Sequence, residues 1–168
     1  MSEFHTAVIA FGSNLANPAQ QVEKAAQAVA SLPEILSLTL SPLYLSKPFG
    51  YAEQPDFVNA VAVLHIQKSM TPVQFLSKLQ EIENEFGRVR TFRNAPRTLD
   101  LDIIDFNHQC LDSPNLILPH PRAHERSFVM LPLSQIAPNY PIGKHGTAQE
   151  LAMKLGNSGI AVLPFQTA

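Results

Sequence analysis

The segment that decides the fold and points to the chemistry runs from Gly87 to Asp105 and reads GRVRTFRNAPRTLDLDIID. Its first part is cationic, because four arginines and no acidic residue lie between Arg88 and Arg97, out of twelve lysines and arginines in the whole chain. Its second part, from Thr98 to Phe106, alternates with the period of a half-buried strand. The sequence therefore predicts a basic loop that leads directly into a strand.

Two carboxylates are expected on one face of that strand. Leu99, Leu101 and Ile103 alternate with Asp100 and Asp102, and residues two apart on one strand face are separated by about 6.5 to 7 Å. Carboxylates at this spacing suit hard cations such as Mg²⁺, and the neighbouring arginines suit phosphate. Either feature alone is common on ordinary protein surfaces, but their adjacency predicts a Mg-nucleotide site.

Length and composition limit the class of protein. With 168 residues, we expect a single domain, residues 1–168, that is large enough to bury a core. A net charge of −2 argues against a general nucleic-acid binder, and the single cysteine, Cys110, excludes an internal disulfide or a multi-thiolate metal site. Residues 1–6 lack a signal-peptide pattern and no apolar run reaches about 18 residues, so we expect a soluble, cytoplasmic protein with no membrane partner. We also expect a monomer.

The order of elements predicts the fold class. The N-terminal half is expected to contain a strand over 6–11 with a turn at 12–14, a helix capped by Asn17 and running to 33, a strand over 35–45, a loop over 46–55, a strand over 57–66 and a helix from Pro72 to Phe86. Shorter elements follow the aspartate strand: a helix over 123–131, another opened by a capping box at Thr147, and an edge strand over 160–164. This order favours an α+β, ferredoxin-like sandwich, mainly an antiparallel sheet with the two long helices packed on it.

Several polar residues allow more than one interpretation. Asn59 lies among apolar neighbours and is either a structural amide or a ligand for a molecule with donor and acceptor groups. Glu83, in the last turn of a helix, is either a surface acid paired with arginine or part of a site. His120 and His124 have zinc-pair spacing, but Pro121 and the lack of a completing Cys or Glu argue against zinc.

A family resemblance combines these features. The segments GSN (12–14), QPDFVNA (54–60), GRVR (87–90) and PRTLDLDI (96–103), with Pro119-His120 and RSF (126–128) downstream, resemble 6-hydroxymethyl-7,8-dihydropterin pyrophosphokinases of folate biosynthesis. The match covers nearly the whole chain in the right order. It implies an ATP-dependent diphosphotransferase that moves diphosphate from ATP to the pterin hydroxymethyl group and releases AMP.

The resemblance also implies residue roles. Two Mg²⁺ ions would be held by Asp100 and Asp102. ATP would be surrounded by Glu83, Arg88, Arg90, Arg97, Ile103, His120 and Arg126. The pterin edge would meet Ser46, Phe49 and Asn59, with the ring between Phe57 and Phe128, an arrangement that suits an amide with both donors and acceptors and two aromatic faces.

The sequence departs from the family pattern at three places. The loop between Arg90 and Pro96 is one residue shorter than usual and lacks the usual Trp-Gly pair, Phe57 replaces a common Tyr, and Lys47 replaces a common Pro. Closure of the 91–96 loop over the pterin is therefore the part of the resemblance with least sequence support.

The hypothesis is direct in-line attack of the substrate hydroxyl on the β-phosphorus, with Arg88, Arg97 and His120 stabilising charge together with the two aspartates. Two other hypotheses remain from the residues themselves. One is a two-metal nucleotidyl transferase or nuclease that uses Asp100 and Asp102, and the other is a ferredoxin-like module that binds an anion without chemistry.

Overall fold

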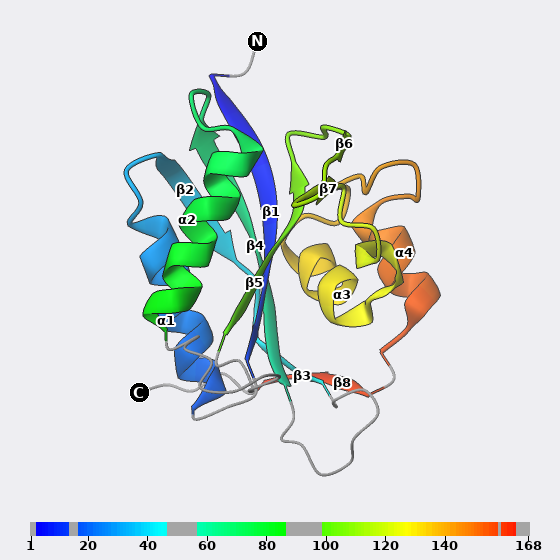
Figure 1. Ribbon diagram of the computed structural model, residues 1–168. Helices are drawn as coiled ribbons and strands as arrows, with labels where there is room; N and C mark the ends of the chain where they lie inside the picture. Colours follow the sequence, from blue (N-terminus) through cyan, green and yellow to red (C-terminus); the bar gives the residue numbers. More distant parts are fainter. Residues whose placement is uncertain (1–2, 14–16, 47–56, 87–98, 158, 164–168) are drawn as a thin grey trace.

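The computed structural model describes residues 3–13, 17–46, 57–86, 99–157 and 159–163. Its centre is an antiparallel sheet in the order β5-β1-β4-β3-β8, in which β2 also pairs with β4 (Figure 1). These strands are β1 (Phe4–Ser13), β2 (Ile35–Leu40), β3 (Tyr44–Ser46), β4 (Phe57–Gln67), β5 (Asp100–Phe106) and β8 (Ile160–Val162). The predicted α+β, ferredoxin-like architecture is confirmed.

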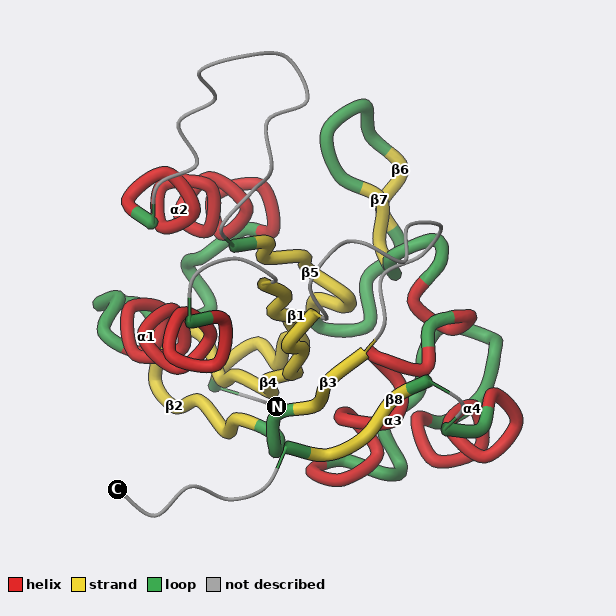
Figure 2. The backbone as a smooth tube through the Cα atoms, turned by 90° about the horizontal axis from the view of Figure 1, so that it is seen from below, coloured by secondary structure: helices red, strands yellow, loops and turns green. Residues whose placement is uncertain are grey.

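Helices cover both faces of the sheet. The long helices α1 (Pro18–Ala30) and α2 (Pro72–Glu85) lie on one face, as predicted, and α3 (Ser127–Ile136) and α4 (Ala148–Leu155) lie on the other (Figures 1 and 2). A short hairpin, β6 (Leu111–Asp112) with β7 (Ile117–Leu118), follows β5. None of the helices in the described part of the chain is long and apolar enough to cross a membrane.

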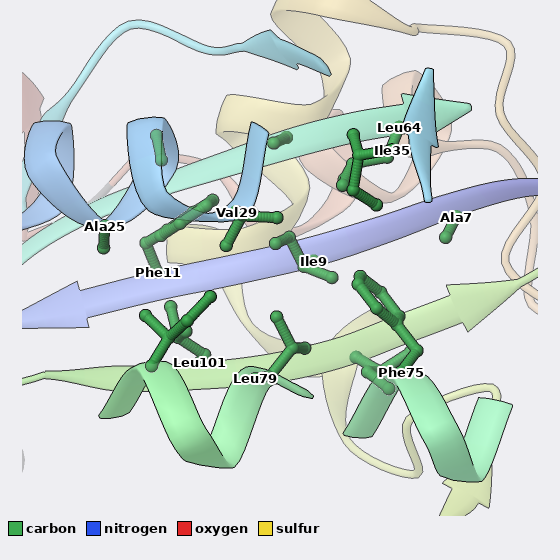
Figure 3. Packing of buried hydrophobic residues seen from close by; sticks show 14 of the residues in the cluster. Ala7, Ile9, Phe11, Ala25, Val29, Ile35, Leu64, Phe75, Leu79 and Leu101 are labelled. Carbon is green, nitrogen blue, oxygen red and sulfur yellow. The ribbon is translucent and has the colours of Figure 1, made fainter. Parts of the chain in front are cut away.

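The larger core lies between the sheet and the two long helices (Figure 3). Alternate residues of β1 point into it, and Ile9 is packed with Val29 of α1 and Leu79 of α2, all three fully buried. Burying one such aliphatic side chain contributes about 1.5 to 3 kcal/mol. Successive side chains of a strand alternate between its faces. The residues of β1 that alternate with Ile9 therefore face away from this core, toward the other side of the sheet.

The helix starts agree only partly with the predictions. Thr71 caps α2 and Thr147 caps α4, each in a reciprocal capping box with the residue three positions on. Asn17 lies at the N-cap position of α1, as predicted, but its backbone is left-handed, with φ 56° and ψ 57°, and its side chain makes no capping hydrogen bond. Pro18 occupies the first helical position, as predicted.

The strand expected from Ile35 to Leu45 is two strands, β2 and β3, separated by residues 41–43. At the break, the Ser41 N–H donates to the Val61 carbonyl at 2.8 Å and the Ser41 hydroxyl accepts from the Val61 N–H at 2.9 Å. Pro42 has no N–H to continue the ladder. Gly12 and Ser13, which were expected in a turn over 12–14, still belong to β1, and Asn14 lies outside the described residues.

A bulge in β5 changes the alternation of its side chains. Val8 of β1 pairs with Asp105 and Ile9 pairs with Ile103, so Ile104 is the extra residue. Ile104 packs with the α3 and α4 side, and Asp105 accepts a hydrogen bond from the Tyr140 hydroxyl on that side at 2.6 Å. The bulge thus keeps a buried carboxylate, 1% exposed, next to a donor.

The helix expected over 123–131 is also interrupted. The 3₁₀ turn η1 (Ala123–Glu125) ends at Arg126, whose extended backbone, φ −109° and ψ 109°, separates it from α3. This break places residues of η1 and the first turn of α3 beside one cavity.

Candidate active site

A cavity of about 610 Å³ lies on the α3 side of the sheet. Strands β1, β3, β4 and β5 contribute to it, together with η1 and the start of α3. Its lining residues are Ala10, Phe11, Gly12, Ser46, Phe57, Asn59, Asp100, Asp102, Arg122, Glu125, Arg126, Phe128 and Val129. This volume is in the range of sites that enclose small molecules.

Small residues of β1 form the floor of the cavity. Gly12 pairs with Asn59 on one side and with Asp100 on the other, while Ala10 pairs with Asp102. A Cβ added to Gly12 would lie 3.5 Å from Asn59 Oδ1, so a longer side chain there would enter the cavity. Asn59 and the two aspartates share the cavity, but one whole strand, β1, lies between them, about 10 Å for two inter-strand steps.

Asn59 is buried, with 5% of its surface exposed, and its amide is oriented by β3. Its Nδ2 donates to the Ser46 hydroxyl at 2.5 Å, and its Oδ1 lies beside Gly12. The amide therefore has a structural partner and still presents an acceptor at the cavity floor. Phe57 and Phe128, both half-buried, line the same cavity.

Asp100 and Asp102 line the cavity from the edge strand β5, and both are partly exposed. The residue between them, Leu101, points into the helix-side core and donates its backbone N–H to Glu83 Oε2 at 2.7 Å. Glu83 is 4% exposed, so it is a buried acceptor at the end of α2 and not a surface acid. It holds β5 at the point where the two carboxylates project.

His120 is tied to β5 by its backbone, since its N–H donates to the Ile104 carbonyl at 2.8 Å. Its Nδ1 accepts from the Arg122 N–H at 3.2 Å. Burial, and secondly the positive charge of Arg126, lower the pKa of His120 to about 4. The imidazole is therefore neutral near pH 7, and because Nδ1 is an acceptor, its proton is on Nε2.

The cavity brings together seven of the candidate residues: Ser46, Phe57, Asn59, Asp100, Asp102, Arg126 and Phe128. Arg126 also lies against Phe128, with its guanidinium carbon 5.7 Å from the ring centroid. Glu83, Ile103 and His120 are not among the lining residues, and the Ile103 side chain is buried in the helix-side core. Phe49, Arg88, Arg90 and Arg97 lie outside the described residues.

Six lining residues were not predicted: Ala10, Phe11, Gly12, Arg122, Glu125 and Val129. Two signals were present in the sequence. Ala10 and Gly12 are small residues at the period of one strand face, and Arg122 and Glu125 are three apart, which places them on one side of a 3₁₀ turn. The second signal was incomplete because the helix expected over 123–131 begins after Arg122.

Comparisons with known sequences find relatives over most of the chain. Residues 8–138 match the family model for 7,8-dihydro-6-hydroxymethylpterin-pyrophosphokinase. The chain is 46% identical over 158 residues to the 2-amino-4-hydroxy-6-hydroxymethyldihydropteridine pyrophosphokinase of Pseudomonas aeruginosa, covering 93% of this chain and 95% of that protein. It is also 46% identical over 132 residues to the Haemophilus influenzae enzyme of the same name, covering 79% of this chain and 81% of the relative.

The chain also matches parts of longer proteins. The chain is 36% identical to the folic acid synthesis protein fol1 of Schizosaccharomyces pombe, covering 92% of this chain but only 21% of that protein. Among solved structures, HPPK-DHPS of Plasmodium falciparum, wild type with pteroate, superposes with a TM-score of 0.68 at 16% identity, covering 92% of this chain and 43% of that chain. The chain belongs to the 7,8-dihydro-6-hydroxymethylpterin-pyrophosphokinase family.

Proposed function

We propose that the cavity between β1, β5 and the start of α3 is the active site in which this chain carries out the reaction of its family. The chain transfers the terminal diphosphate of ATP to the hydroxymethyl group of 6-hydroxymethyl-7,8-dihydropterin and releases AMP, a step of folate biosynthesis. One observation supports the location above all. A single cavity contains an oriented amide with two phenyl rings and, one strand away, a pair of carboxylates.

The pterin occupies the end of the cavity formed by β3, β4 and the first turn of α3. Asn59 Oδ1 accepts from a donor on the ring edge, while Ser46 holds the amide in place. Phe57 and Phe128 contribute aromatic faces on which a flat ring stacks, and each such contact is worth about 0.5 to 1.5 kcal/mol beyond burial. The backbone contact predicted for Phe49 remains part of this proposal.

The donor set at the other end fits magnesium. Asp100 and Asp102 present carboxylate oxygens on one strand face, and no group of three or more protein ligands occurs among the residues that the structure describes. Mg²⁺ commonly binds through one or two carboxylates and keeps water and substrate phosphates as its remaining ligands. Two ions, held by these aspartates, would neutralise charge on the phosphates of ATP.

Arginines are proposed to hold the polyphosphate. Arg126 lines the cavity and keeps its charge at all relevant pH values. Arg88, Arg90 and Arg97 are assigned to ATP by family resemblance, as are Glu83, Ile103 and His120. For His120, the geometry supports donation of a hydrogen bond by neutral Nε2–H rather than a positive charge.

The chemical step is an in-line displacement at the β-phosphorus. A bond forms between the pterin hydroxyl oxygen and that phosphorus, while the bond from the phosphorus to the α,β-bridging oxygen breaks and leaves that oxygen on AMP. The hydroxyl proton is released. Asn59 and the two rings position the hydroxymethyl group, and the arginines stabilise the charge that moves from the diphosphate to AMP.

The test is incubation of the purified chain with ATP, Mg²⁺ and 6-hydroxymethyl-7,8-dihydropterin, followed by nucleotide chromatography. AMP and a pterin diphosphate in equal amounts are expected. Release of inorganic pyrophosphate would indicate a nucleotidyl transferase instead, and the absence of any product would indicate a module that binds an anion without chemistry.

Asp102→Ala tests the metal-binding role directly. We expect turnover to fall at least about 10²-fold, the usual loss when one strong electrostatic stabiliser is removed from an active site. The matched control is Asp112→Ala, which removes an exposed aspartate from β6 and should leave turnover unchanged. A folded Asp102→Ala protein with near wild-type turnover would contradict the proposed metal site.

We also propose that the chain acts in the cytoplasm as a monomer. The single cysteine, Cys110, supports a reducing compartment, where disulfides are rare. Light scattering coupled to size-exclusion chromatography tests the second part, with a mass of 18.5 kDa expected.

A further inference from the structure

Resting on the proposed function, we infer that Arg122 is a further substrate-binding residue, which contacts the polyphosphate of ATP from the turn before η1. Arg122 lines the cavity together with Asp100 and Asp102, and it lies outside the basic loop to which the sequence assigns most of the phosphate-binding arginines.

Backbone hydrogen bonds tie Arg122 to the strand that bears the carboxylates. Its N–H donates to His120 Nδ1 at 3.2 Å, and the His120 N–H donates to the carbonyl of Ile104 at 2.8 Å. Ile104 is two residues beyond Asp102 on β5. The base of the Arg122 side chain is therefore held relative to the two aspartates, even though the side chain itself is exposed.

The 3₁₀ geometry directs Arg122 toward the cavity. Arg122 precedes η1 and Glu125 ends it, so the two residues are three apart, and residues at this spacing eclipse in a 3₁₀ helix. Ala123, between them, is fully buried, and both Arg122 and Glu125 line the cavity. This segment thus places one cationic and one anionic side chain along the same wall.

No carboxylate neutralises the Arg122 guanidinium in the part of the chain that the structure describes, where it has no ion pair within 4.0 Å. Glu125 instead has its Oε1 3.7 Å from His124 Nε2. The ionisable residues of the described lining are three acids and two arginines, Arg122 and Arg126. A tetra-anionic nucleotide needs more positive charge at such a site than the aspartate-bound metal alone supplies, and a planar guanidinium matches phosphate oxygens in two positions.

The experiment compares the wild-type chain with Arg122→Ala, Arg122→Lys and Lys24→Ala. Lys24 is exposed on α1, across the sheet from the cavity, and its removal changes net charge equally. Binding of the non-hydrolysable analogue α,β-methylene-ATP with Mg²⁺ is measured by calorimetry at several salt concentrations, and pterin binding is measured by its own fluorescence. Circular dichroism shows that each variant is folded.

We expect the Kd for the nucleotide to rise about 10-fold in Arg122→Ala, a modest loss for a charge-assisted hydrogen bond because the side chain is exposed. Arg122→Lys should recover part of the affinity, since the charge is kept and the planar fork is lost. The salt dependence of nucleotide binding should be weaker in Arg122→Ala than in the wild type. The pterin affinity of Arg122→Ala and the nucleotide affinity of Lys24→Ala should both equal the wild-type values. A purely structural role would not give this pattern.

Wild-type nucleotide affinity in Arg122→Ala would overturn the inference, as would a loss of pterin affinity in its place. The product assay separates this outcome from failure of the proposed function. If the wild-type chain forms no AMP and no pterin diphosphate, the proposed function fails. If it forms both and Arg122→Ala binds nucleotide equally well, only the role of Arg122 is refuted.

Discussion

Glu83 offers the sharpest test of how β5, which bears the proposed magnesium ligands, is held. Its Oε2 accepts the Leu101 N–H at 2.7 Å, and it is 4% exposed. Leu101 lies between Asp100 and Asp102 on a strand that pairs only with β1 among the described strands. Glu83 therefore replaces the missing strand partner at this point, and its loss should both destabilise the fold and loosen the carboxylates.

The magnitude follows from this hydrogen bond. Glu83→Gln keeps an acceptor of the same size but removes the charge, and a charge-assisted bond is about twice as strong as a neutral one, so about 1 kcal/mol of stability should be lost. Glu83→Ala leaves the buried Leu101 N–H without its acceptor and should cost about 2 to 3 kcal/mol. At about 2 to 4 °C per kcal/mol for a chain of this size, Tm should fall by about 3 °C for Gln and about 8 °C for Ala.

The assay is thermal unfolding followed by far-UV circular dichroism, because the chain has no tryptophan. The Mg²⁺ concentration that gives half-maximal turnover is measured on the same proteins and should rise from wild type to Gln to Ala. Glu81→Ala, an exposed acid on the same helix, is the matched control and should change neither quantity. An unchanged Tm in Glu83→Ala would show that the hydrogen bond contributes no stability, and lower Tm with an unchanged Mg²⁺ requirement would show that it does not position the aspartates.

Three further predictions concern other parts of the molecule. Asn59→Ala removes the acceptor at the cavity floor, so the Kd for the pterin should rise at least about 10-fold with little change in nucleotide binding. Fluorescence measures the pterin affinity and calorimetry measures the nucleotide affinity. Equal losses for both ligands would contradict the assignment of Asn59 to the pterin. Tyr140→Phe removes the 2.6 Å hydrogen bond to the buried Asp105 and should lower the free energy of unfolding by about 1.5 to 3 kcal/mol. Turnover should not change, since neither residue lines the cavity. An unchanged urea unfolding curve would refute this contribution to stability. The pKa of His120 is lowered from 6.5 to about 4 by burial and by Arg126, so the unfolded chain binds this proton at higher pH than the folded chain, and stability falls as pH drops from about 6.5 to about 4. His120→Gln should flatten that part of the stability profile by about 1 to 2 kcal/mol, less than the full shift implies because the ring is only half-buried, and an identical profile would show that His120 does not titrate in this way.

Much of the fold was predictable because the local signals and the tertiary contacts agree. The alternation of leucines and aspartates predicted the two faces of β5, and Leu99, Leu101 and Ile103 are all buried. The capping box at Thr147 predicted the start of α4, because side-chain and backbone groups four positions apart or fewer decide it.

The remaining differences come from contacts that no local pattern contains. Glu83 is buried because a strand later in the chain presents an unpaired N–H to it. Asn17 adopts a left-handed backbone, although its residue type is typical of helix caps. The spacing between Asn59 and Asp100 depends on which strand lies between them, and sheet order is decided by the whole chain.

The bulge at Ile104 has a consequence for how β5 tolerates change. Before it, Asp100 and Asp102 line the cavity; after it, Asp105 turns toward Tyr140 and Phe106 packs against Phe75 of α2. The bulge thereby divides one short strand into a half that lines the cavity and a half that anchors the strand, and the two halves contact different neighbours. Substitutions after Ile104 can change how β5 is anchored without changing the residues that line the cavity. Deleting Ile104 would instead reverse the orientation of the side chains in one half, so that both halves would be affected.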